Sequence, residues 1–423
     1  MHAQVLSKDF QSFWREIETI LNGTSKYHRA IECFDFSGFV FADTNFYRAF
    51  DRKTCFHMAQ FWGKTNFSVE FRETADFSSA RFRTRAFFAN ATFEKDAYFR
   101  GAFFHQDADF LGKFGGVADF SAADFRGEAR FPTARFETYA DFYHAHFHKD
   151  VIFVRTQFGR SDNTGGKDVR PVIADFRSAE FGQPGGVRFH LVNNESNQGF
   201  RARLLGCRVE NLYFEDVSWN KLDGRMVLED ELDLKLAEKI TNPSEYGKAM
   251  EPGRPQPRHE LVAIIYRQMV KNFERGRAYD LAEDCFVGEM EIKRLDPEKP
   301  RFVRTTISLY RGASYYGSSY KRALGILLLL VFIFGLAYAL PFSGLQSRSL
   351  TPTTTITVPN PWIETAKDIG AGIFHSLEIA TFQREPTHVA ASIFGRLVKI
   401  LETILVPSQL ALLLLALRRR LRR

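Results

Sequence analysis

Residues 75–107 decide the fold of the first half of the chain. They divide into three units of eleven residues: ADFSSARFRTR (75–85), AFFANATFEKD (86–96) and AYFRGAFFHQD (97–107). The pattern returns in ADFSAADFRGE (118–128), ARFPTARFETY (129–139) and ADFYHAHFHKD (140–150). Phe recurs at alternating spacings of five and six residues, and Ala stands two residues before most of these Phe. Such self-similarity predicts a solenoid of stacked repeats.

The spacing of the Phe residues excludes two regular structures. In an α-helix, residues five apart point about 140° away from each other, so no single apolar seam forms. In a straight strand, an odd spacing moves the side chain to the opposite face of the sheet. A chain that turns a corner every five or six residues places every Phe inside. Burial of each Phe contributes about 1.5–3 kcal/mol, and stability accumulates along the stack.

The repeat also has a local pattern of a small residue, a polar residue, a large apolar residue and two free positions. Ala75-Asp76-Phe77-Ser78-Ser79 and Ala118-Asp119-Phe120-Ser121-Ala122 both follow it. This pattern resembles the pentapeptide repeat family in its Phe-centred form, over roughly residues 34–230. The resemblance implies an all-β, right-handed quadrilateral β-helix. The alternation of five and six departs from the pure pentad of the family, so we expect coils of about 22 residues, two of the eleven-residue units, with an extra residue at two corners. The expected core residues are Phe77, Phe82, Phe88, Phe93, Phe99, Phe104, Phe120, Phe125, Phe131, Phe136, Phe142 and Phe147.

The rest of the chain suggests five segments. They are an N-terminal helical cap (1–33), the pentapeptide-repeat β-helix (34–240), a Pro/Gly linker (241–258), a helical hairpin neck (259–320) and a two-transmembrane pore-like domain with a re-entrant loop (321–423). An insertion at Ser161–Val172 interrupts the Phe ladder, and irregular coils are expected to continue through Phe189, Phe200, Leu205, Leu212, Phe214 and Leu222. Helical periodicity at residues 260–275 and 278–294, around a short Arg-Gly-Arg turn, predicts the hairpin.

Two apolar segments near the C-terminus have the length of membrane spans. Ala323–Phe342 is twenty residues without a charge, which matches the thickness of a bilayer core. Leu397–Leu417 is less apolar, because it contains Lys399 and Glu402, and the sequence RRRLRR follows it. Lys321 and Arg322 precede the first span. The positive-inside rule therefore predicts a multi-pass protein of the cell inner membrane, with the N-terminal domain and the C-terminus in the cytoplasm.

The order of outer span, short apolar helix at Ile369–Thr381, loop and return span resembles a two-span potassium-channel pore. Bacterial pentapeptide repeat proteins that carry such a module are similar around the approach to the first span. The resemblance implies a homo-oligomer, a tetramer by analogy, with Glu402 near the start of the inner helix. Its pore-loop candidates are Phe374, Ser376, Leu377, Thr381, Phe382, Gln383 and Arg384.

The stretch that corresponds to a selectivity filter lacks the residues that a filter requires. A potassium filter needs a TVGYG-like strand whose glycines let the backbone carbonyls line up. Here the stretch is TFQREP (381–386), which has no glycine and places the cationic Arg384 at the mouth. Potassium selectivity is therefore not expected. A non-selective or anion-tolerant pore, or a pore that no longer conducts, stays open.

Charge and motif content argue against several function classes. Residues 34–160 contain seventeen Lys/Arg and sixteen Asp/Glu, so neither a nucleic-acid groove nor an acidic DNA mimic is expected. No catalytic set stands out, and an enzyme or a cofactor is not expected. His144, His146 and His148 alternate on one repeat, but no acidic partner is evident and no metal site is predicted.

Two functions remain. In the first, a pore-like membrane module is joined to a cytoplasmic β-helix that senses or docks an unknown protein partner. In the second, the membrane part is only an anchor in the lipid bilayer, and the β-helix is a scaffold for protein–protein interaction. The residues between Phe374 and Pro386 separate the two, since a pore demands converging groups there and an anchor does not.

Overall fold

The computed structural model describes residues 15, 32–46, 48–159, 172–182, 186–193, 199–239, 254–347, 361–381, 383 and 387–421. The chain forms two compact units, Met1–Ile292 and Lys293–Arg423. Three predicted segments lie outside the described residues. They are the cap helix over residues 1–30 except Arg15, the insertion after Arg160 up to residue 171, and linker residues 241–253.

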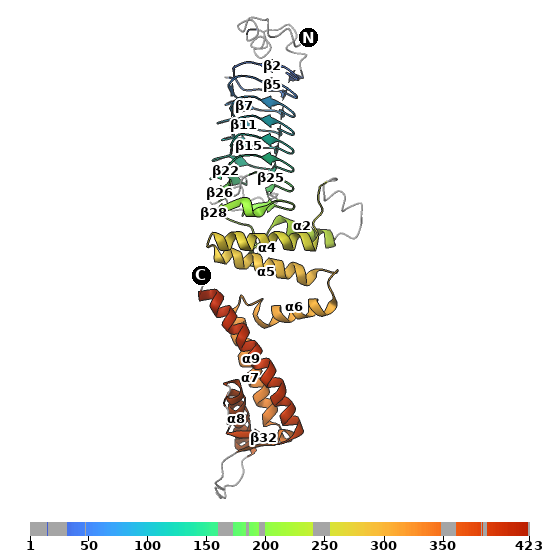
Figure 1. Ribbon diagram of the computed structural model, residues 1–423, viewed down its shortest axis with the longest axis vertical. Helices are drawn as coiled ribbons and strands as arrows, with labels where there is room; N and C mark the ends of the chain where they lie inside the picture. Colours follow the sequence, from blue (N-terminus) through green and yellow to red (C-terminus); the bar gives the residue numbers. More distant parts are fainter. Residues whose placement is uncertain are drawn as a thin grey trace. The chain divides into compact units, whose positions relative to one another are not determined.

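The first unit contains a parallel β-solenoid of about seven turns, made of short strands in four sheets (Figure 1). The first sheet contains β1 (Cys33–Asp35), β4 (Lys53–Cys55), β8 (Ala75–Asp76), β12 (Ala97–Tyr98), β16 (Val117–Asp119), β20 (Tyr139–Asp141), β24 (Ile173–Asp175) and β27 (Arg201–Arg203). The second contains β2 (Val40–Phe41), β5 (Gln60–Phe61), β9 (Arg81–Phe82), β13 (Phe103–Phe104), β17 (Asp124–Phe125), β21 (His146–Phe147) and β25 (Glu180–Phe181). The chain visits the four sheets in turn, as the repeat predicts.

The other two sheets complete each coil. The third contains β3 (Thr44–Asn45), β6 (Thr65–Asn66), β10 (Ala86–Phe87), β14 (Ala108–Asp109), β18 (Ala129–Arg130), β22 (Val151–Val154), β26 (Val187–His190) and β28 (Leu212–Glu215). The fourth contains β7 (Glu70–Phe71), β11 (Thr92–Phe93), β15 (Lys113–Phe114), β19 (Arg135–Phe136) and β23 (Gln157–Phe158). Ala97 pairs with Ala75 of the coil before it and with Ala118 of the coil after it. The expected coil of two repeat units is therefore confirmed, and the second of these coils is one residue short.

The two spacings of Phe correspond to two kinds of corner. Phe77 and Phe82, five apart, are joined by a β-turn in which the N–H of Ala80 donates to the carbonyl of Phe77 at 3.0 Å. Ser79 in this turn has φ 57°, which is the sign that a type II turn requires at its third position. Gly101 occupies the same position one coil later, with φ 62°. The six-residue spacing crosses a wider corner without such a turn, as between Phe82 and Phe88.

The core consists of Phe columns that run along the solenoid axis. Every Phe expected in the core is buried, with at most 2% of its surface exposed. The Phe104 ring lies 4.8 Å from that of Phe82 and 4.7 Å from that of Phe125, with 2° between the planes in both pairs. This separation equals the spacing between neighbouring strands of a sheet, so the backbone ladders and the ring stacks share one repeat distance.

The Phe columns continue beyond the insertion. Phe142 stacks on Phe176 at 4.9 Å, although the insertion separates the two residues in the sequence. Phe189 and Phe200 are also buried in the same core. The expectation that coils extend through Leu222 is wrong, because β29 (Lys221–Leu222) pairs antiparallel with β30 (Arg225–Met226). Asp223 and Gly224 between them both have positive φ, which is the geometry of a tight hairpin turn.

Helix α2 (Glu229–Lys239) covers backbone donors at the end of the first sheet. Its buried Asp230 accepts hydrogen bonds from the N–H groups of Leu204 at 2.7 Å and Leu205 at 3.2 Å. Both residues follow β27, the last strand of that sheet, and a buried N–H without a partner is costly. Burial raises the pKa of Asp230 to about 7, although the hydrogen bond from Leu204 opposes this shift.

Two further helices, α4 (His259–Arg275) and α5 (Tyr279–Leu295), lie side by side and coincide with the two amphipathic patterns (Figure 1). The 3₁₀ helix η3 (Val209–Asn211) packs against α4. Tyr266 of α4 is buried and its hydroxyl accepts from the N–H of Leu228 at 3.1 Å. A Cβ on Gly288 of α5 would lie 2.8 Å from the Tyr266 ring, so this glycine permits the two helices to approach.

The second unit is helical. It contains α6 (Arg301–Ser314), α7 (Tyr320–Ala339), η4 (Pro341–Ser343), β31 (Leu345–Ser347), α8 (Pro361–Ala380), β32 (His388–Ala390) and α9 (Ile393–Leu421). By length and composition, α7 and α9 are suited to cross a membrane. α8 starts well before the helix expected at Ile369–Thr381. β31 and β32 form a short antiparallel ladder between the segments that follow α7 and precede α9.

The adjacent residues Phe103 and Phe104 of β13 allow a matched test of the core. Replacing Phe104 by Ala empties a fully buried position between two stacked rings, and we expect the free energy of unfolding to fall by about 3–5 kcal/mol. Phe103 is half-buried and faces outward under Arg126, so Phe103→Ala is expected to cost about 1 kcal/mol or less. Denaturant unfolding followed by circular dichroism measures both. Equal losses would contradict the inside–outside assignment.

Asp230 gives the solenoid end a defined pH dependence. Because the pKa of Asp230 is about 7 in the folded protein and 3.8 ordinarily, the folded state binds the extra proton between these values. The free energy of unfolding therefore falls through this group as pH rises from about 4 to 7, and stays level above. We expect wild type to lose several degrees of melting temperature relative to Asp230→Asn between pH 5 and pH 8.

Asp76→Asn is the matched control for this experiment. Asp76 also accepts a backbone N–H, from Ser78 at 2.8 Å, but it is half-exposed. Its variant should not gain on wild type as pH rises over the same range. If the melting-temperature difference between wild type and Asp230→Asn does not change with pH, the carboxyl group of Asp230 is ionised over the whole range, and the prediction is wrong.

Candidate functional site

The helices α7 and α8 touch along their backbones. A Cβ on Gly372 of α8 would lie 2.2 Å from the carbonyl oxygen of Gly335 of α7, and a Cβ on Gly335 would lie 2.7 Å from Ile373. Small residues at such a contact let two helices in an apolar setting gain close van der Waals packing. This contact fixes α8 against α7 and determines where the predicted pore-loop residues lie.

Some of the predicted pore-loop residues are exposed and others are buried. Phe374 and Leu377 are 51% and 45% exposed, whereas Ser376 between them is buried. Thr381 is exposed just after the helix, and its hydroxyl donates to the carbonyl of Leu377 at 2.8 Å. The N–H of Gln383 donates to the carbonyl of Glu378 at 3.0 Å. The other two candidates, Phe382 and Arg384, lie outside the described residues.

Glu402 connects three helices. Its carboxylate is fully buried and accepts hydrogen bonds from the hydroxyl of Tyr338 in α7, at 2.9 Å, and from the hydroxyl of Ser376 in α8. Two residues singled out in the sequence, Ser376 and Glu402, are thus brought into contact. Tyr338 was missed by the sequence reasoning, because a Tyr in an apolar run has no distinguishing pattern. Buried carboxylates in apolar helical segments are costly and need such donors.

A second polar group flanks Ser376 on α8 and consists of His375 and Glu378. The carboxylate of Glu378 accepts from the N–H of Thr387 at 3.0 and 3.1 Å, and from its hydroxyl at 2.8 Å. His375 is buried with its ring 4.7 Å from that of Tyr338, and its Nδ1 is 3.7 Å from Glu378. Thr387 also contacts Nδ1 of His388 at 2.9 Å. Glu378 therefore joins α8 to Thr387, the residue directly before β32.

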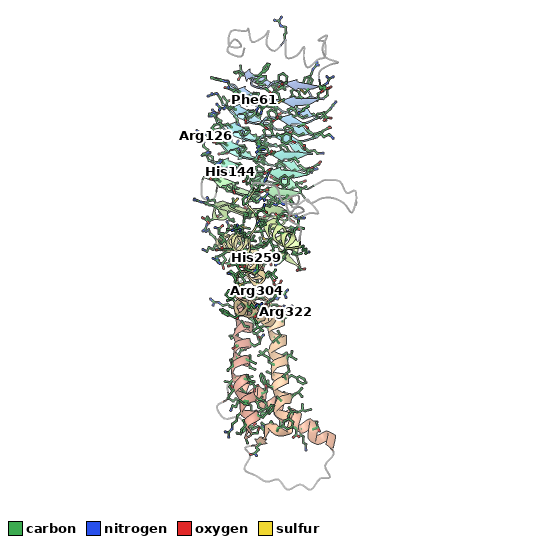
Figure 2. All side chains as sticks on the ribbon, turned by 90° about the vertical axis from the view of Figure 1, so that its right-hand side faces the viewer. Phe61, Arg126, His144, His259, Arg304 and Arg322 are labelled. Carbon is green, nitrogen blue, oxygen red and sulfur yellow. The ribbon has the colours of Figure 1, made fainter. Side chains whose placement is uncertain are left out.

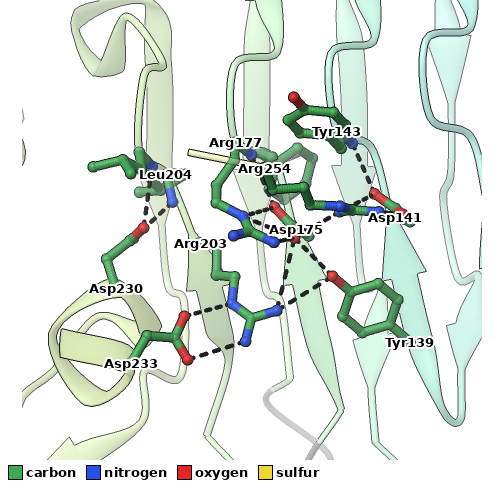
Figure 3. Close-up of polar contacts among 12 residues, drawn as sticks. Tyr139, Asp141, Tyr143, Asp175, Arg177, Arg203, Leu204, Asp230, Asp233 and Arg254 are labelled. Atoms are coloured by element: carbon green, nitrogen blue, oxygen red, sulfur yellow. Dashed lines mark hydrogen bonds and ion pairs between the residues drawn. The ribbon is translucent and has the colours of Figure 1, made fainter. Parts of the chain in front are cut away.

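The first unit has its own polar cluster on the outer surface of the first sheet (Figure 3). Arg254 donates to Asp141 at 3.0 Å and to Asp175 at 2.9 Å, and its guanidinium lies 4.6 Å from the centre of the Tyr143 ring. Arg254 comes from the linker, where it is followed by Pro255 in a segment without regular structure. Burial raises the pKa of Asp141 above its ordinary value despite the opposing charge of Arg254.

Asp175 is the centre of this cluster. It is fully buried, and it accepts from Arg177 at 3.0 Å and from the hydroxyl of Tyr139 at 2.7 Å. Burial alone would raise the pKa of Asp175, but the hydrogen bonds and charge of Arg177 hold it below the ordinary value. Arg203 lies 3.7 Å from the same carboxylate. The solenoid residues thus preorganise an anionic position for the linker arginine.

The cluster continues into α2 through two ion pairs, each with two hydrogen bonds. Arg203 donates to Asp233 at 2.7 and 3.0 Å, and Arg201 donates to Glu229 at 2.6 and 2.8 Å. Each is a two-bond contact between a planar guanidinium and a carboxylate, which fixes direction as well as distance. The sequence did not indicate these pairs, since the two members of each pair are far apart along the chain. Their role is to hold α2 on the last coil of the first sheet.

The three alternating histidines face outward on the solenoid. His146 Nδ1 lies 3.2 Å from Glu180, and His148 Nε2 lies 3.1 Å from Asp124, so two of them do have acidic neighbours. Figure 2 shows Arg126 and His144 along the same edge of the solenoid. Within the part of the chain that the structure describes, no group of three His, Cys, Asp or Glu side chains is arranged to hold a metal ion.

Comparison with known families supports the solenoid half of the interpretation. Residues 67–112 and 113–157 match the profile described as pentapeptide repeats (9 copies). No curated protein and no solved structure matches the chain. The family match ends at residue 157, so the resemblance of residues 321–423 to a channel subunit stays a prediction. Taken with the four-sheet geometry and the buried Phe columns, the match identifies residues 67–157 as pentapeptide repeats.

Proposed function

We propose that the protein is a membrane-anchored pentapeptide repeat protein of the cell inner membrane. In this proposal α7 and α9 cross the bilayer, α8 lies between them as a re-entrant helix, and the solenoid and the C-terminus face the cytoplasm. The observation that carries the proposal is the joining of α7, α8 and α9 at Glu402, which matches the layout of outer helix, pore helix and inner helix. α7 has 20 residues, which span about 30 Å, the thickness of a bilayer core.

The surfaces of α7 and α9 support their contact with lipid. Leu328 and Ile333 of α7 are 59% and 50% exposed, and Ile400 and Ile404 of α9 are 57% and 59% exposed. The buried polar groups Tyr338, Ser376 and Glu402 satisfy one another inside the unit. An apolar exterior around internally paired polar groups is what a bilayer requires.

The pore module of the proposal does not select potassium. The stretch TFQREP (381–386) offers no glycine for a carbonyl-lined filter, and it carries Arg384. Lys399 is an exposed cation on α9, one turn before the buried Glu402. In a fourfold assembly, rings of Arg384 and Lys399 would oppose cation entry and favour anions.

The solenoid of the proposal is a docking domain for a protein partner, and its winding is right-handed, as in the family that it resembles. Its outer surface already holds an extended segment of the chain itself, since Arg254 is bound by Asp141, Asp175 and the ring of Tyr143. A rigid face that binds one arginine-bearing segment in this way supports a role in recognising peptides.

A second candidate function is a non-conducting, membrane-tethered scaffold. The internal pairing of Glu402 favours it, because the carboxylate of α9 is then a structural link between helices and is not available to a lumen. This candidate keeps the same topology and the same docking role for the solenoid, and it differs from the first in ion flux alone.

The topology can be tested with the cysteines of the chain. Cys33 is exposed on the solenoid, and Val389 in β32 is 45% exposed between the two spans. In spheroplasts treated with a membrane-impermeant maleimide, wild type should stay unlabelled until the membrane is permeabilised. Val389→Cys in a Cys33→Ser, Cys55→Ser background should label at once. Labelling of wild type in intact spheroplasts would contradict a cytoplasmic solenoid.

Ion flux separates the two candidate functions. Purified full-length protein in liposomes is given potassium, sodium and chloride gradients in turn. The pore proposal predicts chloride flux at least equal to potassium flux, reduced several-fold by Arg384→Ala and by Lys399→Gln. Ser408→Ala is the control, because its hydroxyl donates to its own helix at Ile404. Potassium-selective flux would overturn the filter argument, and silence in all three gradients from inserted protein would leave the scaffold.

A further inference from the structure

Helix α6 presents apolar side chains to the outside although it precedes the first span. Phe302 and Leu309 are 73% and 69% exposed. They are seven residues apart, so they lie on the same face of the helix. Arg304 and Arg311 lie on the opposite face, and Arg301 lies beside them. A helix with large apolar groups on one face and arginines on the other is typical of the interface between a bilayer and water.

The position of α6 within the second unit agrees with an interfacial helix. Figure 1 shows α6 lying across the direction of α7 and α9 at the end where α7 begins and α9 finishes. Gln409 of α9 donates to the carbonyls of Ala313 and Ala323, both at 2.9 Å, and so joins α6, α7 and α9 at one point. Tyr315, Tyr316 and Gly317 all have positive φ, and this turn redirects the chain from α6 into α7.

The same end of the unit is strongly cationic. Residues 299–363 contain no Asp or Glu, and neither do residues 403–423. Arg301, Arg304, Arg311, Lys321, Arg322, Arg418, Arg419 and Arg420 all belong to this end. Arg322 lies 5.3 Å from the centre of the Tyr315 ring, and Arg420 lies 4.6 Å from that of Tyr320. Figure 2 shows Arg304 and Arg322 close to the start of the α7 helix. Tyr and Arg at the end of a span are typical of the headgroup region.

We infer that α6 lies in the inner surface of the bilayer, with Phe302 and Leu309 at the acyl boundary, and that the surrounding arginines bind the phosphates of anionic lipids. The inference rests on the proposed membrane function and adds a ligand class to it. Charge complementarity favours lipid over a second copy of the chain as the occupant of this face. A second copy would bring the same arginines together, whereas an anionic leaflet neutralises them.

The test places a fluorescent probe on α6 in the full-length protein. Leu309→Cys, in a Cys33→Ser, Cys55→Ser background, is labelled with bimane and reconstituted into phosphatidylcholine vesicles with a small fraction of phosphatidylglycerol. Bromine is carried on the acyl chains of one lipid or the other. We expect quenching at position 309, and several-fold stronger quenching per mole by brominated phosphatidylglycerol. The preference should weaken as salt is added, because headgroup contacts are screened.

Two variants serve as matched controls. Ser308→Cys places the probe on the exposed polar side of the same helix, where quenching should be weak. The triple variant Arg301→Gln, Arg304→Gln, Arg311→Gln should keep quenching at position 309 but lose the preference for phosphatidylglycerol. Equal quenching by the two lipids in the unchanged protein would overturn the role of the arginines.

A probe at Leu328 of α7, which is 59% exposed, separates failure of this inference from failure of the proposed function. Quenching at 328 without quenching at 309 would leave the spans in the membrane and overturn the interfacial placement of α6. Disulfide cross-linking between two copies of the unlabelled Leu309→Cys protein, together with absence of quenching in the labelled protein, would assign the face to self-association. Absence of quenching at both positions would overturn the membrane anchor itself.

Discussion

The solenoid depends on one repeat distance shared by its backbone and its core. Neighbouring strands are separated by about 4.8 Å, and the Phe rings of successive coils stack at nearly the same distance, as Phe104 does on Phe82 and Phe125. A ring can meet the ring above it only if each coil returns to the same angular position. In this chain the return takes two repeat units, as the pairing of Ala75, Ala97 and Ala118 shows. The small residue two positions before each Phe is buried as well, and Thr65 and Val151 take the place of Ala in two of the coils.

Because every coil must return to the same angular position, the repeat could be predicted from the sequence. The rest of the chain has no such condition, and prediction there was limited. Spacing alone gave the inward positions, because every coil obeys the same rule. The antiparallel hairpin at Lys221–Met226 follows a local rule of its own, and the Asp223-Gly224 pair was a signal that the Phe ladder concealed. By contrast, Asp230 finds the N–H groups of Leu204 and Leu205 only because α2 folds back over the last coil. Contacts of this kind depend on three-dimensional closure, and no periodicity encodes them.

The helical unit shows the same division. The apolar runs of α7 and α9 follow from composition, and the resemblance to a channel subunit brought Ser376 and Glu402 to attention as separate residues. Ser376 and Tyr338 each donate a hydrogen bond to Glu402. Both bonds follow from the close contact of Gly335 with Gly372, because this contact sets the rotation of α8 about its axis. Glycines in a helix are usually interpreted as weak points, and only the partner backbone at 2.2 Å from the position of a Cβ reveals their purpose.

In both units, buried carboxylates are satisfied by side chains that donate hydrogen bonds to them. In the solenoid, the linker residue Arg254 neutralises Asp141, and in the helical unit Tyr338 and Ser376 satisfy Glu402. The difference lies in what each partner can do. Tyr338 and Ser376 are fixed in helices, so the Glu402 link is permanent as long as the helices pack. Arg254 lies in a segment without regular structure, so its contact does not depend on the packing of a helix. This asymmetry agrees with the proposal that the solenoid, and not the helical unit, is the part that meets a protein partner.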